Sequence, residues 1–424
     1  MLSIEPARSP QARVGKIGIA LAGGGPLGAF YELGALHALS EAIVGRELTG
    51  LDVYVGVSSG SLAAAGLANG FDTTALGSIF IHEGSTLAAF SPGMLLQPAI
   101  GEYLRRASDL PWLLAMIARR YALDPLHSNW STAIGPLARA LPTAIFDNKP
   151  LERFLHRLFG ASGHTDDFRQ LRSRLFVVAT NLNSGQSVCF GDSGHDRVPI
   201  SRAIIASAAL PGLYAAVEID HEHYVDGALV RTLHASLALE EGCDLVICIN
   251  PLVPFDASHR RAGRHANLAN EGLPAILGQT FRAIIHSRMQ VGMASYAARF
   301  PHADMVLLEP DRHDERLFFA NVFRYSGRQH LVEHAYQRTR RDLLSQHVAL
   351  GAVLARRGLA LDLRVLRDRR RTFVSAARDR ARHRRRVAPR LRRALHRLEG
   401  LLSDRDLERM STHGSQPVAP AARR

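Results

Sequence analysis

Short apolar runs with little polar alternation mark the first part of the chain. Lys16–Ala22 and Leu51–Val55 are of this kind, and strands that are buried on both faces show such continuous runs. A glycine-rich turn follows each run, and a helix-like segment comes next, Ala29–Leu36 in the first case and Ser61–Asn69 in the second. Strand and helix in alternation are typical of an α/β protein with a mainly parallel sheet.

The same pattern resumes further along the chain. Phe176–Ala179, Leu245–Asn250 and Asp304–Leu308 are predicted strands, and Glu271–Ala298 and Gln329–Gln346 are predicted helices. The first of these helices carries apolar residues at Leu273, Ile276, Leu277, Phe281, Ile284 and Ile285.

Residues 80–140 differ from their surroundings, because prolines interrupt an otherwise apolar and helix-like segment. The prolines are Pro92, Pro98, Pro111, Pro125 and Pro136. Two interpretations stay open: a mobile cap over a lipid site, and helices packed onto the sheet. We favour the second.

A Gly-x-Ser-x-Gly motif stands where the second strand gives way to its helix. In Gly56-Val57-Ser58-Ser59-Gly60, the turn is so sharp that the Ser58 hydroxyl projects from the backbone and only small residues fit around it. This is the sequence pattern of a nucleophile elbow. The pentapeptide alone also fits a Ser/Gly-rich turn without chemistry.

The loop Gly23-Gly24-Gly25-Pro26-Leu27-Gly28 follows the first strand and opens a helix. Backbone amides at such a place point together and add to a positive dipole end, so they can hold an oxyanion. Pro26 has no N–H, and we expect Gly24 and Gly25 to be the main donors, with Gly23 and Gly28 in the same loop. The letters also fit a dinucleotide fingerprint, with Glu47 and Asp52 as its acidic residues. The serine motif on the next strand argues against that interpretation.

Tyr224-Val225-Asp226-Gly227-Ala228 supplies a candidate base for Ser58. A serine hydroxyl needs a base within hydrogen-bond reach, and an aspartate in a dry site can serve if its proton affinity is raised. Gly227 and Ala228 would let the backbone pass close to Ser58. Taken alone, Asp-Gly is more often a plain turn.

Together and in this order, the three motifs resemble those of the patatin-like phospholipases. Val178–Gly185 and Ala206–Leu213 also look like segments of that family, and the resemblance covers roughly residues 15–310. It implies a three-layer α/β fold with a mainly parallel sheet and a Ser58–Asp226 dyad. It also implies an oxyanion hole in the glycine loop and the hydrolysis of lipid acyl esters. Leu27 departs from the family, which usually has Lys or Arg there, and this puts anion stabilisation or head-group preference in doubt.

Histidines offer two competing hypotheses. His221 and His223, beside Asp220 and Asp226, are the only tight cluster for a metal, but a metal there would hold the proposed base as a ligand. His234 would turn the dyad into a triad, although a histidine on a helix surface is commoner. We expect no metal and no cofactor.

Composition and the three cysteines indicate a folded protein of a reducing compartment. The chain has 424 residues, 46% of them hydrophobic, and its three cysteines, Cys189, Cys243 and Cys248, lie in apolar runs that favour buried thiols in a reducing compartment. Neither a signal-peptide h-region nor a membrane span is evident, so we expect a cytoplasmic protein, peripheral to membranes at most. Only Lys16 and Lys149 are lysines, a bias that suggests a high-GC bacterial source.

Four regions are expected. They are a flexible tail at residues 1–14, an acyl hydrolase domain at 15–310 with its motif-bearing core in 15–250, a helical extension at 311–358 and an Arg-rich tail at 359–424.

The Arg-rich tail holds most of the charge. Between Arg364 and Arg397 there are 15 arginines and two aspartates, a net charge equal to the +13 of the whole chain. Leucines and other apolar residues recur at helical spacing on both sides of Pro389, which predicts two basic amphipathic helices that fit an anionic membrane. A solvated, partly disordered tail is an equally good interpretation. Specific nucleic-acid binding is not expected, because Phe373 is the only aromatic residue in this run.

The sequence therefore predicts a serine acyl hydrolase that acts on a phospholipid or another acyl-ester lipid. The alternative is a scaffold that kept the fold and binds an anionic membrane with little or no catalysis.

Overall fold

The computed structural model describes residues 1–8, 15–81, 90–123, 141–230, 233–258, 268–319 and 325–380. The chain forms two compact units, Met1–Arg370 and Arg371–Arg424. All the elements named below belong to the first unit. In the second, residues 373–380 are helical.

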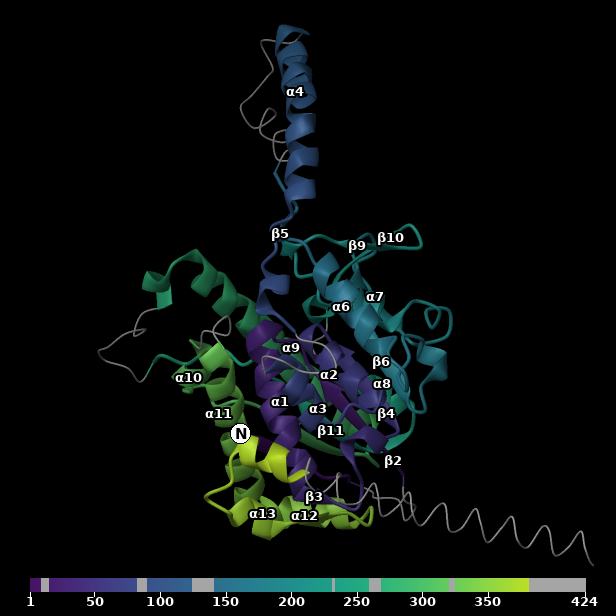
Figure 1. Cartoon of the computed structure of the whole chain (residues 1–424), viewed down its shortest axis with the longest axis vertical. Coiled ribbons are helices and arrows are strands. Elements are labelled where there is room, and N and C mark those ends of the chain that lie inside the picture. The colour runs from purple at the N-terminus through teal and green to yellow at the C-terminus, as the bar shows by residue number, and fades with distance from the viewer. Residues whose placement is uncertain are drawn as a thin grey trace, which may run out of the picture. The chain divides into compact units, whose positions relative to one another are not determined.

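A mixed sheet forms the centre of the first unit (Figure 1). Within the described ranges its strands run in the order β1-β12-β11-β2-β4-β6-β10-β9, and β7 pairs with β6. The five in the middle, from β12 to β6, are parallel to one another. The bounds are β1 Leu2–Glu5, β2 Lys16–Leu21, β4 Val53–Val57, β6 Arg174–Asn181, β7 Ser187–Phe190, β9 Val217–Ile219, β10 Glu222–Asp226, β11 Cys243–Ile249 and β12 Asp304–Leu308.

In the part of the chain that the structure describes, two short strand pairs lie outside this sheet. One joins β3 (Ile43–Val44) to β13 (Ala360–Leu361), and the other joins β5 (Ala144–Phe146) to β8 (Gly212–Tyr214).

Helices cover both faces of the sheet, as Figure 1 shows. α2 packs on β2, β4 and β6, while α8 packs on β2, β4 and β11. The bounds are α1 Gly25–Ala42, α2 Ser59–Ala68, α3 Thr73–Phe80, α4 Ile100–Leu123, α6 Lys149–Phe159, α7 Ile200–Ser207, α8 Ala235–Glu240, α9 Leu273–Arg299, α10 Glu315–Phe318, α11 Tyr325–Ser345, α12 His347–Ala355 and α13 Leu363–Arg367. The predicted fold class, a mainly parallel α/β sheet between helical layers, is confirmed.

Alternate residues of the central strands face opposite cores, because side chains alternate along a strand. Val53, Val55 and Val57 of β4 face a cluster that α8 and the buried side of α9 complete. Tyr54 and Gly56 face the side covered by α2, and all of β4 is buried. This two-sided burial is the physical reason why the central strands appear in the sequence as continuous apolar runs.

The expected flexible tail at residues 1–14 is partly wrong. Leu2–Glu5 forms β1, which pairs antiparallel with β12 at the edge of the sheet and buries Leu2. A short polar segment with alternating Leu2 and Ile4 can gain a strand's hydrogen bonds when an edge is open to it. Residues 9–14 lie outside the described part.

The segment predicted as an extension at 311–358 packs closely on the first helix of the fold. α11 lies along α1, and a Cβ on Gly34 of α1 would stand 2.5 Å from the Val332 carbonyl oxygen. Only glycine permits this approach of two helices. The close contact between α11 and α1 makes this segment part of the packed helices of the fold.

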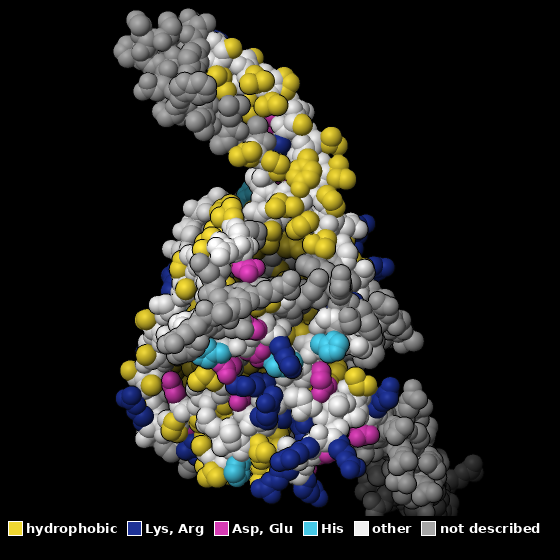
Figure 2. Space-filling view, turned by 90° about the vertical axis from the view of Figure 1, so that its left-hand side faces the viewer, with side chains coloured by type: hydrophobic (Ala, Val, Ile, Leu, Met, Phe, Trp, Pro, Cys, Tyr) yellow, Lys and Arg dark blue, Asp and Glu magenta, His cyan; other side chains and the backbone are white. Residues whose placement is uncertain are grey.

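Of the prolines between residues 80 and 140, Pro111 does not break a helix as expected, whereas Pro92 begins a short 3-10 helix and Pro98 bridges Phe146 ahead of α4. α4 runs unbroken through Pro111, and many of its apolar side chains are exposed, among them Leu104 and Trp112. Figure 2 shows hydrophobic side chains along α4 and just below it, whereas most Lys and Arg side chains in that view lie lower. The interpretation of helices packed onto the sheet is therefore wrong for α4. Pro125 and Pro136 lie outside the described residues.

α9 confirms the predicted long helix but presents much of its apolar surface to solvent. Its exposed large apolar residues share one face, because they recur at helical spacing. They are Leu273, Ile276, Leu277, Phe281, Ile284 and Val291, and we call them the α9 ridge. Leu273 is 66% exposed and Val291 is 71% exposed, whereas Ile285 is buried. Among the exposed positions between Leu273 and Val291, Arg288 is the only charged residue.

The predicted continuous helix at the start of the Arg-rich tail is wrong. Residues 360–367 form β13 and then the short α13, and the Arg340 guanidinium donates to the carbonyls of Val365, Leu366 and Asp368. Backbone carbonyls bonded in this way belong to the fold, and the first unit extends to Arg370. Residues 381–424, including the second predicted amphipathic helix, lie outside the described part.

The three cysteines are free thiols, as predicted; Cys243 and Cys248 are buried and Cys189 is partly exposed. Among the helices that the structure describes, none has the length and apolar character needed to cross a membrane.

Candidate active site

Ser58 occupies a strained turn between β4 and α2. Its backbone has φ 51° and ψ −124°, a conformation that costs a non-glycine residue energy. The flanking glycines let the turn close: a Cβ on Gly56 would lie 2.4 Å from Cα of Ser61, and one on Gly60 would lie 2.5 Å from the Leu21 carbonyl oxygen. The predicted elbow is the geometry that the chain adopts.

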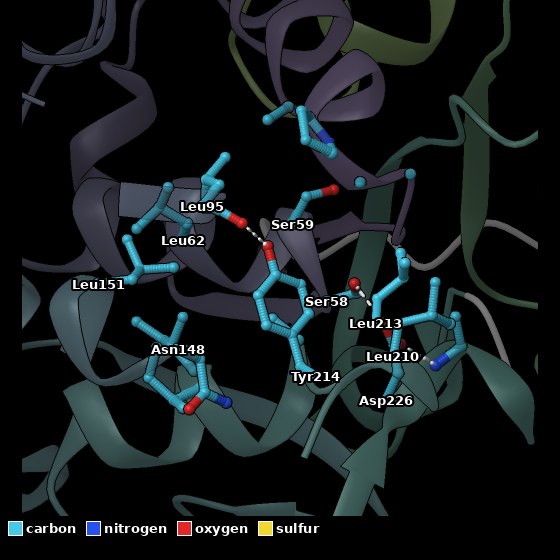
Figure 3. Close-up of a pocket in the computed structure, with 18 of the residues that line it drawn as sticks. Ser58, Ser59, Leu62, Leu95, Asn148, Leu151, Leu210, Leu213, Tyr214 and Asp226 are labelled. Carbon is cyan, nitrogen blue, oxygen red and sulfur yellow. Dashed lines mark hydrogen bonds between the residues drawn. The ribbon is translucent and has the colours of Figure 1, made fainter. Parts of the chain in front are cut away.

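The Ser58 hydroxyl donates a hydrogen bond of 2.6 Å to Oδ2 of Asp226 (Figure 3). Both residues are buried, with 6% of Ser58 and 4% of Asp226 exposed. Asp226 ends β10, and its second oxygen, Oδ1, accepts from the Ala228 amide at 2.9 Å. The carboxylate is thus held in one orientation, with one oxygen fixed by the backbone and the other on the serine.

Neighbouring strands bring the two side chains together. β4 pairs with β6 and β6 pairs with β10, so the ends of β4 and β10 flank the same strand. Gly227 then passes so close to β6 that a Cβ there would lie 2.2 Å from the Val178 carbonyl oxygen. Glycine is required after Asp226 for this approach.

Burial raises the pKa of the Asp226 carboxyl from 3.8 to about 6, against the opposing effect of its hydrogen bonds from Ser58 and Ala228. A carboxylate of this basicity still ionises at neutral pH, yet it accepts a proton more readily than an exposed aspartate. That combination suits a general base.

The glycine loop lies against the serine. A Cβ on Gly23 would be 2.8 Å from Cβ of Ser58, and Gly24 and Gly25 line the cavity in front of it. Within the described part of the chain, the amides of these three glycines have no hydrogen-bond partner. They lie at the start of α1, where the helix dipole adds positive potential.

Gly28 differs from the other loop glycines. Its amide donates to the Gly24 carbonyl at 3.0 Å as the first hydrogen bond of α1. It is therefore not a free donor, and its expected place in the oxyanion hole is wrong. The residue packs the helix instead, because a Cβ on Gly28 would lie 2.9 Å from the Pro251 ring.

Ser207 is a residue of the site that motif analysis missed. Its hydroxyl accepts from the Ser58 amide at 2.8 Å and donates to the Val178 carbonyl at 2.5 Å. These two hydrogen bonds of Ser207 hold the strained turn in place. The first of them also engages the Ser58 amide as a donor. The sequence signal was weak: Ser207 lies in the segment Ala206–Leu213, which resembles a segment of the family, but the resemblance gave this serine no role.

Ser58 and Asp226 open onto a cavity of about 410 Å³. In Figure 3 they lie on one side of Tyr214, with Leu62, Leu95, Asn148 and Leu151 on the other. The Tyr214 hydroxyl donates to the Leu95 carbonyl at 2.9 Å, which holds the ring in place. The lining is almost entirely apolar; its polar members are Ser58, Ser59, Asn148, Tyr214, Asp226 and Arg282.

The other candidates do not meet at this cavity. His234 is buried ahead of α8 with φ 43° and does not line the cavity, and no other histidine among the described residues lines it. His221 and His223 are exposed, and the described residues hold no cluster of three metal-ligating side chains. Asp52 precedes β4, at the opposite end of that strand from Ser58, and bonds the Ile17 amide. This position does not suit the acidic residue of a dinucleotide site.

The family model of the patatin-like phospholipases matches residues 19–239, a stretch that includes the glycine loop, Ser58 and Asp226. The chain belongs to the patatin-like phospholipase family. Among solved structures, VipD from Legionella pneumophila is 18% identical with a TM-score of 0.31, and the match covers 64% of this chain and 55% of VipD. The type III effector ExoU is 17% identical with a TM-score of 0.34, over 78% of this chain and 52% of ExoU.

The chain thus spans about half the length of each of these two proteins. TM-scores of this size do not establish a shared architecture, so the family assignment rests on the matched model.

Proposed function

We propose that this patatin-like protein is a serine acyl hydrolase that cleaves an acyl ester of a phospholipid or a related lipid. One observation carries the proposal: the hydrogen bond between the Ser58 hydroxyl and Asp226 inside an apolar cavity. An activated serine needs a base within this distance. An acyl chain needs an apolar space, since water gives it no stabilisation.

The proposed reaction has two steps. Ser58 Oγ attacks the ester carbonyl while its proton passes to Asp226, and the amides of Gly23, Gly24 and Gly25 hold the oxyanion. Asp226 then protonates the leaving alcohol, and the acyl-enzyme remains. Water attacks the acyl carbonyl and gives its proton to Asp226; the fatty acid leaves, and the proton returns to Ser58.

We further propose that the protein meets its substrate at a membrane surface. The α9 ridge supports this, because an exposed apolar face of that extent is typical of an interaction surface and Phe281 belongs both to the ridge and to the cavity lining. The arginines beyond residue 359 would add attraction to anionic lipids. No role for a nucleic acid or a cofactor is part of the proposal.

Labelling with a fluorophosphonate tests the mechanism. Ser58→Ala should abolish labelling, and both Ser58→Ala and Asp226→Asn should lower ester hydrolysis about a thousandfold or more, because each removes one half of the nucleophile–base pair. Ser78→Ala and Asp109→Asn are matched controls on α3 and α4 and should keep full activity. Full activity in a folded Ser58→Ala protein would exclude the mechanism. Vesicle binding without labelling of the unmodified protein would favour the scaffold hypothesis.

A further inference from the structure

Arg282 is the one basic side chain in the lining of the cavity that holds Ser58 and Asp226, as far as the described residues show. It lies on the side of α9 that faces the cavity, next to Phe281. Its side chain is partly buried, and its guanidinium carbon lies 5.2 Å from the centre of the Phe318 ring. The structure thus holds the cation at the wall of an apolar space.

The guanidinium has no ionic partner there. No hydrogen bond and no ion pair of Arg282 occurs in the part of the chain that the structure describes. It forms no pair with Asp226, whose two oxygens are bonded to Ser58 and Ala228. Burial alone lowers the pKa of Arg282, with no acidic side chain to offset it.

The buried Arg357 of the same chain shows the contrast. It pairs with Asp244 at 3.0 Å and with Asp304 at 2.7 Å. Buried charges are as a rule paired in this way, because removing a charge from water is costly. A guanidinium in the cavity that no described acidic side chain pairs with is therefore suited to bind an anion from outside the chain.

We propose that Arg282 binds the phosphate of a phospholipid substrate and so places the acyl ester at Ser58. This rests on the proposed function. A planar guanidinium presents paired donors that match phosphate oxygens, and in an apolar cavity the attraction is only weakly screened. Head-group phosphate and acyl ester are a few bonds apart in a phospholipid, so one cavity can hold both.

Phosphate binding by Arg282 can be separated from catalysis with two substrates that carry the same acyl chains, of which only one has a phosphate. Phosphatidylcholine and diacylglycerol are presented in the same neutral detergent micelles, and kcat and KM are measured for Arg282→Gln and Arg282→Lys. We expect Arg282→Gln to lower kcat/KM on phosphatidylcholine at least tenfold, mainly through KM, and to leave diacylglycerol within about twofold. Arg282→Lys should keep part of the preference, because it keeps the charge but loses the planar fork.

Arg299→Gln is a matched control. Arg299 lies on the same helix and also stands over an aromatic ring, that of Phe300 at 5.3 Å, but it is exposed and does not line the cavity. This variant should leave both substrates unchanged. Equal losses on both substrates in folded Arg282→Gln would assign Arg282 a structural role and overturn the proposal, as would an unchanged value on phosphatidylcholine.

A binding measurement distinguishes phosphate from the carboxylate of the released fatty acid. Dodecyl phosphate, dodecanoate and dodecanol are compared as inhibitors of a soluble short-chain ester. We expect Arg282→Gln to weaken inhibition by dodecyl phosphate at least tenfold and to leave dodecanol unchanged. If only dodecanoate depends on Arg282, the residue binds product and the phosphate assignment is wrong. If the unmodified protein cleaves no ester at all, the proposed function itself fails, which is a separate outcome.

Discussion

At the scale of single residues, Asp226 meets two opposing demands. Its burial beside Ser58 makes it basic enough to take a proton, but the same burial makes its charged form costly in the folded protein. Among the described residues, two hydrogen bonds support the charge, one from a side chain and one from the backbone. The residue therefore gives the protein reactivity at the expense of stability.

The first consequence concerns activity. As the proposed base, Asp226 works only when ionised, so kcat/KM for a soluble ester should fall tenfold per pH unit below about 6 and level off above it. A pH–rate profile between pH 4.5 and 8 measures this. A profile that stays flat through pH 6 would contradict the assignment of Asp226 as base.

The second consequence concerns stability. A pKa raised from 3.8 to about 6 contributes stability that is fully present below pH 3.8 and is lost as pH rises through 6. At pH 7.5 the charged form then costs the fold about 3 kcal/mol. Asp226→Asn removes this charge, so its melting temperature should exceed that of the unmodified protein at pH 7.5, and the difference should vanish near pH 4. Equal stability at both pH values would show that the carboxyl is not buried as described.

Residues of the site differ in how far the sequence reveals them. Ser58 lies in a local motif whose glycines are needed by the turn itself, so it could be predicted. Ser207 and Arg282 could not, because what they do depends on what lies opposite them in space. In the sequence, Arg282 looks like any other arginine. Its proposed role became visible only when the structure placed it in the cavity lining with no ionic partner among the described residues.

At the scale of elements, continuous apolar runs predicted the central strands well. A strand that is buried on both faces needs apolar side chains at successive positions, so its sequence shows an unbroken apolar run. For α9, helical spacing predicted the helix itself, whereas the interpretation of helices packed onto the sheet was wrong for α4. Helical spacing of apolar residues predicts a helix with one apolar face, but it does not say whether the protein's own core covers that face. On α9, one side is buried against the sheet and the ridge is not.

The α9 ridge leads to a prediction on membrane contact. Leu277 and Ile284 are exposed and do not line the cavity, so the double variant Leu277→Ser, Ile284→Ser should leave hydrolysis of a soluble ester unchanged. Each side chain contributes roughly 1–2 kcal/mol when buried, so binding to neutral phosphatidylcholine vesicles should weaken about tenfold or more in a sedimentation assay. Val348→Ser, a change at an exposed apolar position on α12, is the control. Undiminished vesicle binding in the double variant would rule out the ridge as the contact.

At the scale of the whole molecule, charge and catalysis are separated along the chain. The matched family model and the cavity lie within residues up to 370, while many of the arginines follow later. Residues 359–370 look like part of the tail in sequence, yet β13 pairs with β3 and Arg340 binds the residues after it. A domain boundary placed at residue 359, where the Arg-rich tail was expected to begin, would separate β13 and α13 from the rest of the fold.

Truncation tests this division. The chain ending at Arg370 should hydrolyse a soluble ester as well as the full chain does, but it should bind anionic vesicles more weakly, and the lost part of the binding should be salt-sensitive. A chain that ends at Gly358 should melt at a lower temperature than one that ends at Arg370, because it lacks β13 and α13. Unchanged binding after removal of residues 371–424 would favour the solvated-tail interpretation.

The α9 ridge also leads to an expectation for the protein in plain buffer. Apolar side chains gain by leaving water, so without a bilayer we expect the ridges of two molecules to pair, and the paired fraction to rise with protein concentration. Because Phe281 belongs to both the ridge and the cavity lining, we expect such a pair to cover part of the cavity and to lower activity. A lipid bilayer would then have two roles: it would supply the substrate, and it would separate the paired molecules by taking up their ridges.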